Sequence, residues 1–282
     1  MQALAERLET AVGGGRFERA VPIQFSALKT FSPAPESLAG LKLTAVGRRG
    51  KYVLLDFGGG GGGGGGGAVG ARIAFHLSQG GRVDVEDPPK ATRPRFGVVR
   101  LFFADRPSVL LKEFGTERKA GWWVLAEGDE GPLAGLGPEP FSDEFAELIA
   151  AGADGRRVHT MLRDQRTVAG IGRGYVDDIL HRARISPYAS LKSLGGDERA
   201  ALVDAVRHVL TEGLEAERRR TGGLPTKLGD HFAVHGRSGS PCPTCGADLR
   251  RVSYESYEVA YCPACQTGGK VLADRRLSRL VR

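Results

Sequence analysis

Four cysteines are the residues of this chain whose type and spacing point most directly to chemistry. They form two C-x-x-C pairs, Cys242 with Cys245 and Cys262 with Cys265, and sixteen residues separate the pairs. A C-x-x-C turn presents two thiolates from one bend, and Zn²⁺ prefers four thiolates in a tetrahedral shell. The pattern therefore predicts one bound zinc ion. Because four protein ligands leave no open position for a substrate, the predicted role is structural.

Disulfide bonds and redox catalysis are the alternative uses of these cysteines. Disulfides suit a secreted protein, but Glu6, Arg7 and Glu9 interrupt the stretch where a secretion signal would be apolar. A redox C-x-x-C needs a thioredoxin-like βαβ context, which this pattern lacks. The sequence has no run of about 18 apolar residues, so no membrane span is predicted. We therefore expect a cytoplasmic protein that is not associated with a membrane.

The net charge of +7 is concentrated in the second half of the chain. Residues 1–150 contain 18 basic and 18 acidic residues, whereas residues 151–282 contain 22 basic and 15 acidic ones. A basic surface attracts polyanions. The charge alone leaves two interpretations open, a nucleic-acid partner or an ordinary solvated surface.

The N-terminal half predicts a helix followed by an antiparallel β-structure. Residues 2–12 place Ala3, Leu4, Leu8 and Val12 on one helical face. Short β-like runs follow, punctuated by Gly and Pro, at residues 41–47, 51–57, 71–78, 97–103 and 108–114. Their spacing favours an antiparallel sandwich over a βαβ fold. Ten consecutive glycines, Gly58 to Gly67, predict a flexible loop between two of these strands.

The second half of the chain changes to helical periodicity. Helices are predicted at residues 142–151, 156–165, 174–184 and 197–220. Ser142 and Asp197 are the expected N-caps of the first and last of these helices. Between the cysteine pairs, residues 249–261 alternate in a way that predicts a β-hairpin.

A glycine-rich turn, Gly170 to Gly174, leads into the third of these helices. Backbone N–H groups at a helix start, unshielded by side chains, form a natural seat for a phosphate. A dinucleotide-binding motif is excluded, because the turn is not G-x-G-x-x-G and no strand precedes it. The alternative to a phosphate site is a plain turn between two helices.

Five segments, in their order along the chain, resemble the formamidopyrimidine-DNA glycosylase and endonuclease VIII family. They are RRGKYVLLDF, FHLSQGGRV, GLGPEPFSDEF, TVAGIGRGYVDDILHRARISPYA and FAVHGRSGSPCPTCG…YCPACQTGGK. The resemblance implies an α+β multidomain fold. Its parts are an N-terminal β-sandwich with a flanking helix over residues 1–130, a helix–two-turn–helix domain over 131–226 and a zinc finger over 227–282. It also implies a monomer that binds one Zn²⁺, in a protein of bacterial type that is associated with the nucleoid.

The resemblance further implies base-excision repair of double-stranded DNA that contains a damaged base or an abasic site. Such an enzyme flips the damaged base out of the duplex and cuts its glycosidic bond. In many members an abasic-site lyase step then nicks the strand. The alternatives are a DNA-binding relative without activity and an unrelated zinc-ribbon protein, which would not prefer damaged DNA.

The resemblance assigns DNA contacts in the N-terminal domain. Lys51 matches a lysine that contacts a phosphate near the reacting sugar. His76 and Gln79 lie in the loop that family members project into the gap left by the flipped base. Phe114 and Arg118 are the expected companions of that loop, in a segment, KEFGTERKAGW, that departs from the family's DPRRFG.

The same resemblance assigns contacts in the C-terminal half. Gly170, Gly172 and Arg173 form the phosphate turn, with Arg173 where the family has asparagine. Family fingers place an arginine about five residues before the third cysteine, a stretch that holds Tyr257 and Glu258 here. A glutamate repels a phosphate, so Lys270 is the expected substitute.

The family's nucleophile is the secondary amine of an N-terminal proline, which is followed by a glutamate that assists as an acid. This sequence begins MQALAERLET and contains neither residue at that place. Three interpretations follow: a misassigned translation start, a binding protein without lyase activity, or another amine, such as Lys51, as nucleophile.

Overall fold

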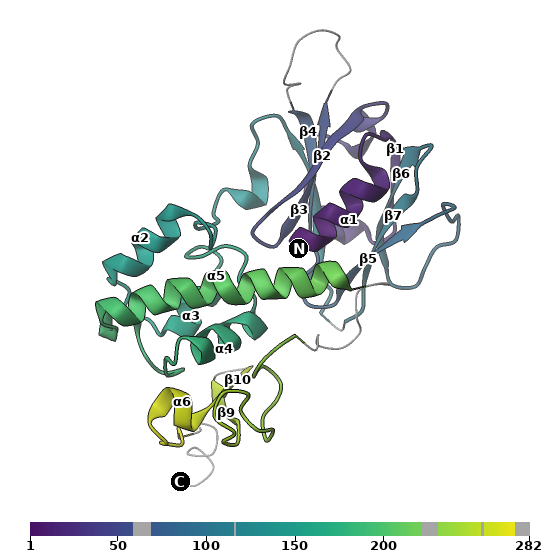
Figure 1. The fold of residues 1–282 in the computed structure, drawn as a ribbon. Coiled ribbons are helices and arrows are strands. Elements are labelled where there is room, and N and C mark those ends of the chain that lie inside the picture. The colour runs from purple at the N-terminus through teal and green to yellow at the C-terminus, as the bar shows by residue number, and fades with distance from the viewer. Residues whose placement is uncertain (59–68, 116, 221–230, 255–256, 274–282) are drawn as a thin grey trace. The chain divides into compact units, whose positions relative to one another are not determined.

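The computed structural model describes residues 1–58, 69–115, 117–220, 231–254 and 257–273, and its contacts divide the chain into two compact units (Figure 1). The first unit is built on Met1–Gly135 and the second on Leu136–Arg220 with the C-terminal segment. The predicted glycine loop lies, from residue 59 on, outside the described residues. Among the helices of the described residues, none is both long and apolar enough to cross a membrane.

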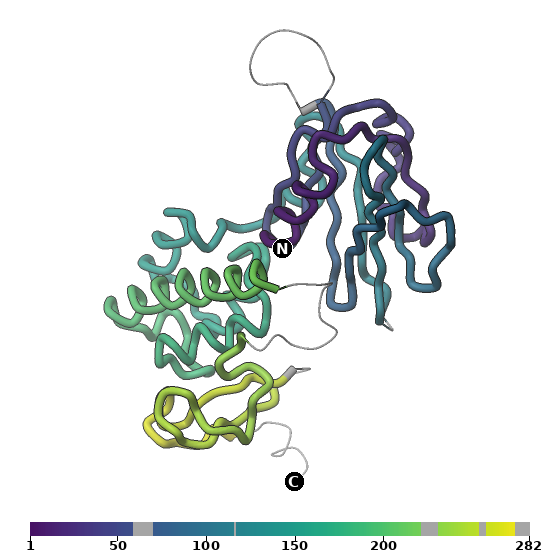
Figure 2. The backbone as a smooth tube through the Cα atoms, turned by 45° about the vertical axis from the view of Figure 1, so that its right-hand side comes forward, coloured from purple at the N-terminus to yellow at the C-terminus, as the bar shows by residue number. Residues whose placement is uncertain are grey.

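The first unit combines helix α1 (Gln2–Val12) with eight strands, all paired antiparallel in the order β5-β7-β6-β1-β2-β3-β4-β8. The strands are β1 (Arg16–Pro22), β2 (Lys42–Arg49), β3 (Tyr52–Gly58), β4 (Val69–His76), β5 (Gly81–Glu86), β6 (Gly97–Ala104), β7 (Ser108–Glu113) and β8 (Gly121–Ala126). Short 3-10 turns occupy Phe25–Ala27, Pro35–Leu38 and Gly131–Leu133. Helix α1, purple in Figures 1 and 2, lies alongside β2. The predicted antiparallel β-domain with a flanking helix is confirmed.

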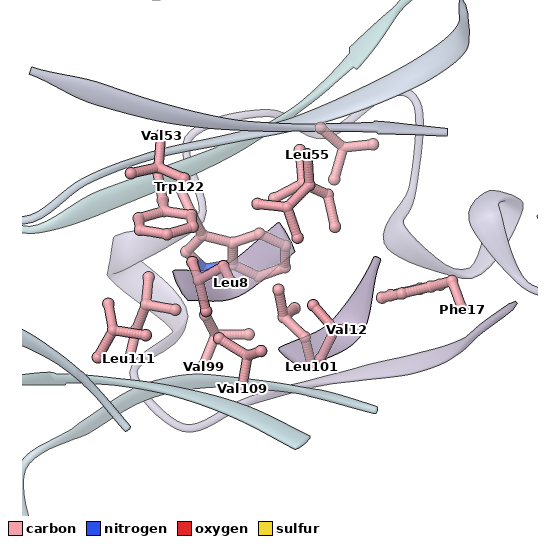
Figure 3. Packing of buried hydrophobic residues seen from close by; sticks show 14 of the residues in the cluster. Leu8, Val12, Phe17, Val53, Leu55, Val99, Leu101, Val109, Leu111 and Trp122 are labelled. Atoms are coloured by element: carbon pink, nitrogen blue, oxygen red, sulfur yellow. The ribbon is translucent and has the colours of Figure 1, made fainter. Parts of the chain in front are cut away.

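The strands form one continuous sheet whose two halves pack face to face. Strands β1 and β2 join the halves through a single residue pair, Arg16 with Lys42. Figure 3 shows side chains from both halves meeting in one core, with Leu8 and Val12 of α1 among them. Trp122 of β8 is fully buried in this core. The sandwich is thus made by folding one sheet, because the inner faces of its two halves can then bury apolar residues against each other.

Three strands, β1, β5 and β8, were not anticipated from the sequence. Strand β5 carries charged residues at alternate positions, and β1 carries three, Arg16, Glu18 and Arg19, which are all exposed. Such short, polar-sided strands give a weak apolar pattern. Backbone hydrogen bonds to neighbouring strands stabilise them, since β1 pairs with β6 and β5 pairs with β7.

The second unit contains the four predicted helices, followed by the hairpin. They are α2 (Asp143–Ala151), α3 (Val158–Arg163), α4 (Arg173–Arg182) and α5 (Gly196–Arg219), with a 3-10 turn at Leu191–Ser193 before α5. The hairpin pairs β9 (Arg250–Tyr254) with β10 (Tyr257–Tyr261), and the short α6 (Pro263–Thr267) follows it. In Figures 1 and 2 the hairpin and α6, in yellow, lie next to α4.

The N-cap of α2 is the predicted residue, whereas the N-cap of α5 is not. Ser142 caps α2, because its Oγ accepts the N–H of Phe145 at 3.3 Å. Asp197 does not cap α5, contrary to the prediction. The N-cap is Gly195, whose own N–H donates to the Glu198 carboxylate at 2.8 Å. The helix therefore begins earlier than expected, with Asp197 inside its first turn.

Helices α4 and α5 approach closely where Tyr175 meets Gly213. A Cβ atom added at Gly213 would lie 2.4 Å from Cε1 of Tyr175, which is far inside van der Waals contact. Gly213 is buried. The glycine is thus required by the neighbouring ring and not by its own backbone.

We expect Gly213→Ala to lower the free energy of unfolding of this unit by roughly 1–2 kcal/mol. Overpacking costs about 1–3 kcal/mol, which outweighs the helix-propensity gain of about 1 kcal/mol. The matched control is Gly196→Ala in the same helix, where an added Cβ meets nothing within 4 Å. Urea unfolding measures both variants. An unchanged or higher stability of Gly213→Ala would contradict the packing argument.

Candidate functional site

The four cysteines converge into one cluster in the second unit. Their sulfur atoms lie within 4.8 Å of one another, with Cys242 and Cys265 at 3.9 Å and Cys245 and Cys262 at 3.5 Å. A tetrahedron of sulfurs about 2.3 Å from a zinc ion has S···S edges of about 3.8 Å. The thiols therefore fit a tetrahedral metal ion without large rearrangement.

The thiols of the cluster differ in how readily they lose a proton. The N–H of Ala247 lowers the pKa of the Cys245 thiol to about 7. Burial and the neighbouring thiols raise the pKa of Cys265 above its usual range. A bound cation would lower the pKa of all four thiols, because its positive charge stabilises the four thiolates at once.

Two side chains attach the cluster to helix α4 and the turn after it. Nε2 of the buried His181 lies 3.2 Å from Sγ of Cys242. The Gln266 amide accepts the N–H of Cys262 at 2.8 Å and donates to the Ile185 carbonyl at 2.8 Å. The finger is thereby packed on α4 as one structure, which the sequence pattern did not indicate.

The glycine turn is held by Gln165, which lies just before it in the chain. The Gln165 Oε1 accepts the N–H of Gly170 at 2.9 Å, and its Nε2 donates to the carbonyls of Arg163 and Ile171. Gly170 has a φ of 91°, a conformation that favours glycine. Gln165 thus provides hydrogen-bond partners for one backbone N–H group and two backbone carbonyls at the turn.

The turn leads into α4 with Gly172 as N-cap, and within the described part of the chain no side chain caps the start of this helix. The first N–H groups of α4 therefore remain available for an anion. Arg173, the first helical residue, is exposed. Gly174 packs closely, since an added Cβ would lie 2.8 Å from His235 and 2.9 Å from Phe232.

In the first unit, Lys51 and His76 lie at one end of the sheet. Lys51 is in the turn between β2 and β3, and the next residue, Tyr52, pairs with His76. The Tyr52 and His76 rings are 5.0 Å apart. Burial, together with the positive charge of Lys51, lowers the pKa of His76. Its Nδ1 accepts the N–H of Ser78 at 3.2 Å, so the neutral ring carries its proton on Nε2.

The predicted gap-filling residues lie at the same end. Gln79 is exposed in the turn between β4 and β5. The carbonyl of the next residue, Gly80, accepts the N–H of Phe114 at 2.9 Å, and the Phe114 side chain is 46% exposed. The structure thus brings the loops of Gln79 and Phe114 into direct contact.

Arg118 is exposed in the loop between β7 and β8. Hydrogen bonds to the Glu113 carboxylate fix the backbone of this loop. Glu113 is buried, and its Oε1 accepts the N–H groups of Lys119 and Ala120 at 2.8 and 2.9 Å. The path of the loop is thereby set by a buried carboxylate. The sequence did not identify Glu113, because a single acidic residue at a strand end gives no pattern.

Two residues of the finger bear on its charge. Lys270 is exposed in the turn after α6. Glu258 of β10, expected to repel a phosphate, is paired across the hairpin with Arg251 at 2.7 Å. The negative charge of Glu258 is therefore largely offset by its neighbour.

Two family models match the chain. The model for the formamidopyrimidine-DNA glycosylase N-terminal domain matches residues 1–121, and that for the H2TH domain of the same glycosylases matches residues 136–222. A formamidopyrimidine-DNA glycosylase of Geotalea daltonii is 32% identical over 278 residues, covering 93% of this chain and 97% of that protein. The chain belongs to the formamidopyrimidine-DNA glycosylase family.

Other members of the glycosylase family are similar to different extents. An uncharacterized formamidopyrimidine-DNA glycosylase-like protein of Mycobacterium tuberculosis is 43% identical over 154 residues, which are 52% of this chain and 94% of that protein. The MutM (Fpg) structure from Thermus thermophilus has a TM-score of 0.78 at 27% identity and covers 94% of this chain and 96% of its own. Lactococcus lactis Fpg with abasic-site DNA shares the fold, with a TM-score of 0.79 at 22% identity, covering 94% of this chain and 97% of that chain.

We expect Gln165→Ala to loosen the glycine turn, Gly170 to Gly174. The substitution leaves the N–H of Gly170 and two carbonyls without their partner, which costs roughly 1–3 kcal/mol. Hydrogen exchange should speed up at Gly170, and the free energy of unfolding should fall. Gln24→Ala is the control, since Gln24 makes an exposed side-chain contact with Ser26. Unchanged hydrogen exchange at Gly170 would show that the Gln165 side chain does not hold the turn.

Proposed function

We propose that this chain is a DNA glycosylase and abasic-site lyase of base-excision repair, acting on damaged bases or abasic sites in double-stranded DNA. The observation that carries the proposal is the uncapped start of α4, which follows the Gln165-held turn and is packed on a four-cysteine finger. Membership of the glycosylase family supports it. The Lactococcus lactis structure with abasic-site DNA has the same fold, and we take such DNA as the partner.

DNA binding, in this proposal, uses backbone and cationic contacts to phosphates. The N–H groups after Gly172 and the guanidinium of Arg173 would hold a phosphate beside the lesion. In the other unit, Lys51 and the Nε2–H of His76 would bind a phosphate near the reacting sugar. The exposed Lys270 would add a cationic contact from the finger.

The gap left by a flipped base must be filled, since an unstacked duplex is unstable. The exposed Gln79 and Phe114 lie on loops that contact each other, which suits joint insertion into the gap. Arg118, on the same loop as Phe114, would contact the DNA beside it.

The proposed reaction needs an amine nucleophile. The amine nitrogen bonds to C1′ of the sugar as the bond from C1′ to the base breaks, and an acid protonates the departing base. The bond between C1′ and O4′ then breaks, and O4′ takes up the proton that the amine loses, which leaves an open-chain imine. Loss of a C2′ proton from this imine expels the 3′ phosphate by β-elimination. Lys51 is the amine that the sequence offers as an alternative to the family's N-terminal proline.

Borohydride trapping on duplex DNA with an abasic site tests this proposal. Borohydride reduces the imine to a stable amine, so an active chain becomes covalently linked to DNA. We expect trapping by the chain carrying the family's Pro-Glu terminus. Lys51→Ala and the chain as written, assayed in parallel, report whether Lys51 supplies the amine. Tight binding to abasic DNA without trapping by any of these proteins would instead identify a non-catalytic damaged-DNA-binding relative.

The metal of the finger, we propose, is one structural Zn²⁺, supported by the thiol geometry. Four thiolates hold the β9–β10 hairpin and α6 together, while the finger's own apolar clusters are small. Zinc therefore supplies much of the finger's stability, as in other small metal modules.

We expect one zinc ion per chain, and loss of the finger's structure when a chelator removes it. Metal analysis gives the stoichiometry, and hydrogen exchange before and after chelation gives the protection of β9 and β10. Strands of the first unit serve as the internal control and should keep their protection. A finger equally protected without metal would contradict a structural role.

A further inference from the structure

His181, in the last turn of helix α4, reaches the cysteine cluster from outside the finger. Its Nε2 atom lies 3.2 Å from Sγ of Cys242, which is 61 positions further along the chain. Both side chains are shielded from water, since His181 is 6% exposed and Cys242 is 3% exposed. Water therefore competes little for this contact, and a hydrogen bond here is stronger than one at the surface.

The chemistry of a metal-bound thiolate determines the direction of this hydrogen bond. A thiolate has lone pairs and no proton, so its sulfur can only accept. When a cation is bound by Cys242, Nε2 of His181 must therefore carry a proton and donate to Sγ. Without a cation the Cys242 thiol can donate to Nε2 instead, so the two atoms can be hydrogen-bonded in either state.

His181 contacts one ligand of the cluster and does not belong to the ligand set. Among the described residues, the side chains whose ligand atoms all lie within 4.8 Å of one another are the four cysteines. Four thiolates already complete a tetrahedral shell. His181 is thus placed as a hydrogen-bond partner of Cys242.

A donor to the Cys242 thiolate stabilises the metal-bound form of the cluster. Four thiolates outweigh the charge of one divalent cation, so the site keeps an excess of negative charge. The backbone N–H of Thr244 donates to Sγ at 3.4 Å, and His181 adds a second donor from a different element. Such partners orient a ligand and tune its charge, and their removal typically costs about 10–100-fold in metal affinity.

Packing of the finger on α4 is the alternative role for His181, but another residue of the helix already provides much of it. Asp178, which is 5% exposed, accepts three consecutive backbone N–H groups of the segment that leads into the finger. They belong to Ala233, Val234 and His235, at distances of 2.6, 2.9 and 3.0 Å. Hydrogen bonds to a buried carboxylate are strong, so this segment is fixed to α4.

Asp177 adds two more contacts between α4 and the C-terminal segment. Its Oδ2 lies 2.6 Å from Nδ1 of His235 and accepts the N–H of Ala260 on β10 at 3.2 Å. The finger is therefore held on α4 by bonds that do not involve His181. What His181 adds is the contact with a thiolate.

We propose that His181 is a positioning residue for the metal of the finger: its Nε2–H group donates to the Cys242 thiolate and raises the affinity of the cluster for Zn²⁺. His181 does not bind the metal itself. Its contact makes the retention of zinc depend on α4, the helix that begins at the glycine turn. The inference rests on the proposed function, since it concerns the zinc site proposed there.

Competition between the full-length protein and a chelator of known zinc affinity measures this effect. We expect His181→Phe, which keeps a ring and loses the donor, to bind Zn²⁺ about 10–100-fold more weakly. His181→Gln is the rescue, because its amide N–H can reach the place of Nε2, and its affinity should stay within about threefold of the unmodified protein. His208→Phe, on the surface of α5, is the matched control and should leave the affinity unchanged. Loss of affinity in both His181 variants, or in neither, would overturn the role of the donor.

A measurement on the unmodified protein covers the case in which His181→Phe does not fold. Nitrogen NMR of the isotopically labelled, zinc-loaded protein reports which ring nitrogen of His181 carries a proton. We expect a proton on Nε2, and an unprotonated Nε2 would overturn the proposal. If the unmodified protein takes up no zinc, the proposed metal site and the role of His181 both fail. If it binds zinc as expected and does not prefer damaged DNA, the proposed repair function fails and the role of His181 stands.

Discussion

The binding of three consecutive backbone N–H groups by one carboxylate is the constraint on which the second unit depends. Asp178 lies within α4, so the helix that begins at the glycine turn also determines where the finger segment runs. One helical turn on from Asp177, His181 reaches a cysteine of the cluster. This spacing puts both contacts on one side of the helix. The turn, the helix and the cysteine cluster are therefore linked by short, directional bonds.

The first unit is organised by apolar burial. One sheet folds on itself across the weak junction between β1 and β2, and α1 completes the core. Its site residues come from three separate turns at one end of the strands. The antiparallel ladder brings them together, because Tyr52, His76 and Gly121 are cross-strand neighbours. The register of the sheet therefore determines the spacing of the loops proposed to face DNA.

Periodicity and spacing were sufficient for helices α1 to α5, for most of the strands and for the cysteine cluster. The stripe of Leu4, Leu8 and Val12 predicts α1, and two C-x-x-C pairs predict the cluster, because both signals are local. The buried carboxylates were not predictable in the same way. Asp177 and Asp178 occupy an ordinary polar position within a helix, and their finger-side partners lie 58 and 55 residues further along the chain. Only the folded chain shows that they are buried and what they bind.

Glu113 has a consequence for how the family can diversify. Its carboxylate fixes the loop from β7 to β8 through the backbone N–H groups of Lys119 and Ala120, so the path of the loop does not depend on the exposed side chains it carries. Phe114 and Arg118 can then be exchanged for other residue types while the main chain stays in place. A departure from the common family motif in this loop changes the chemical character of its tip and preserves its geometry. Variation at these two exposed positions can therefore change what the loop contacts while its main chain stays in place.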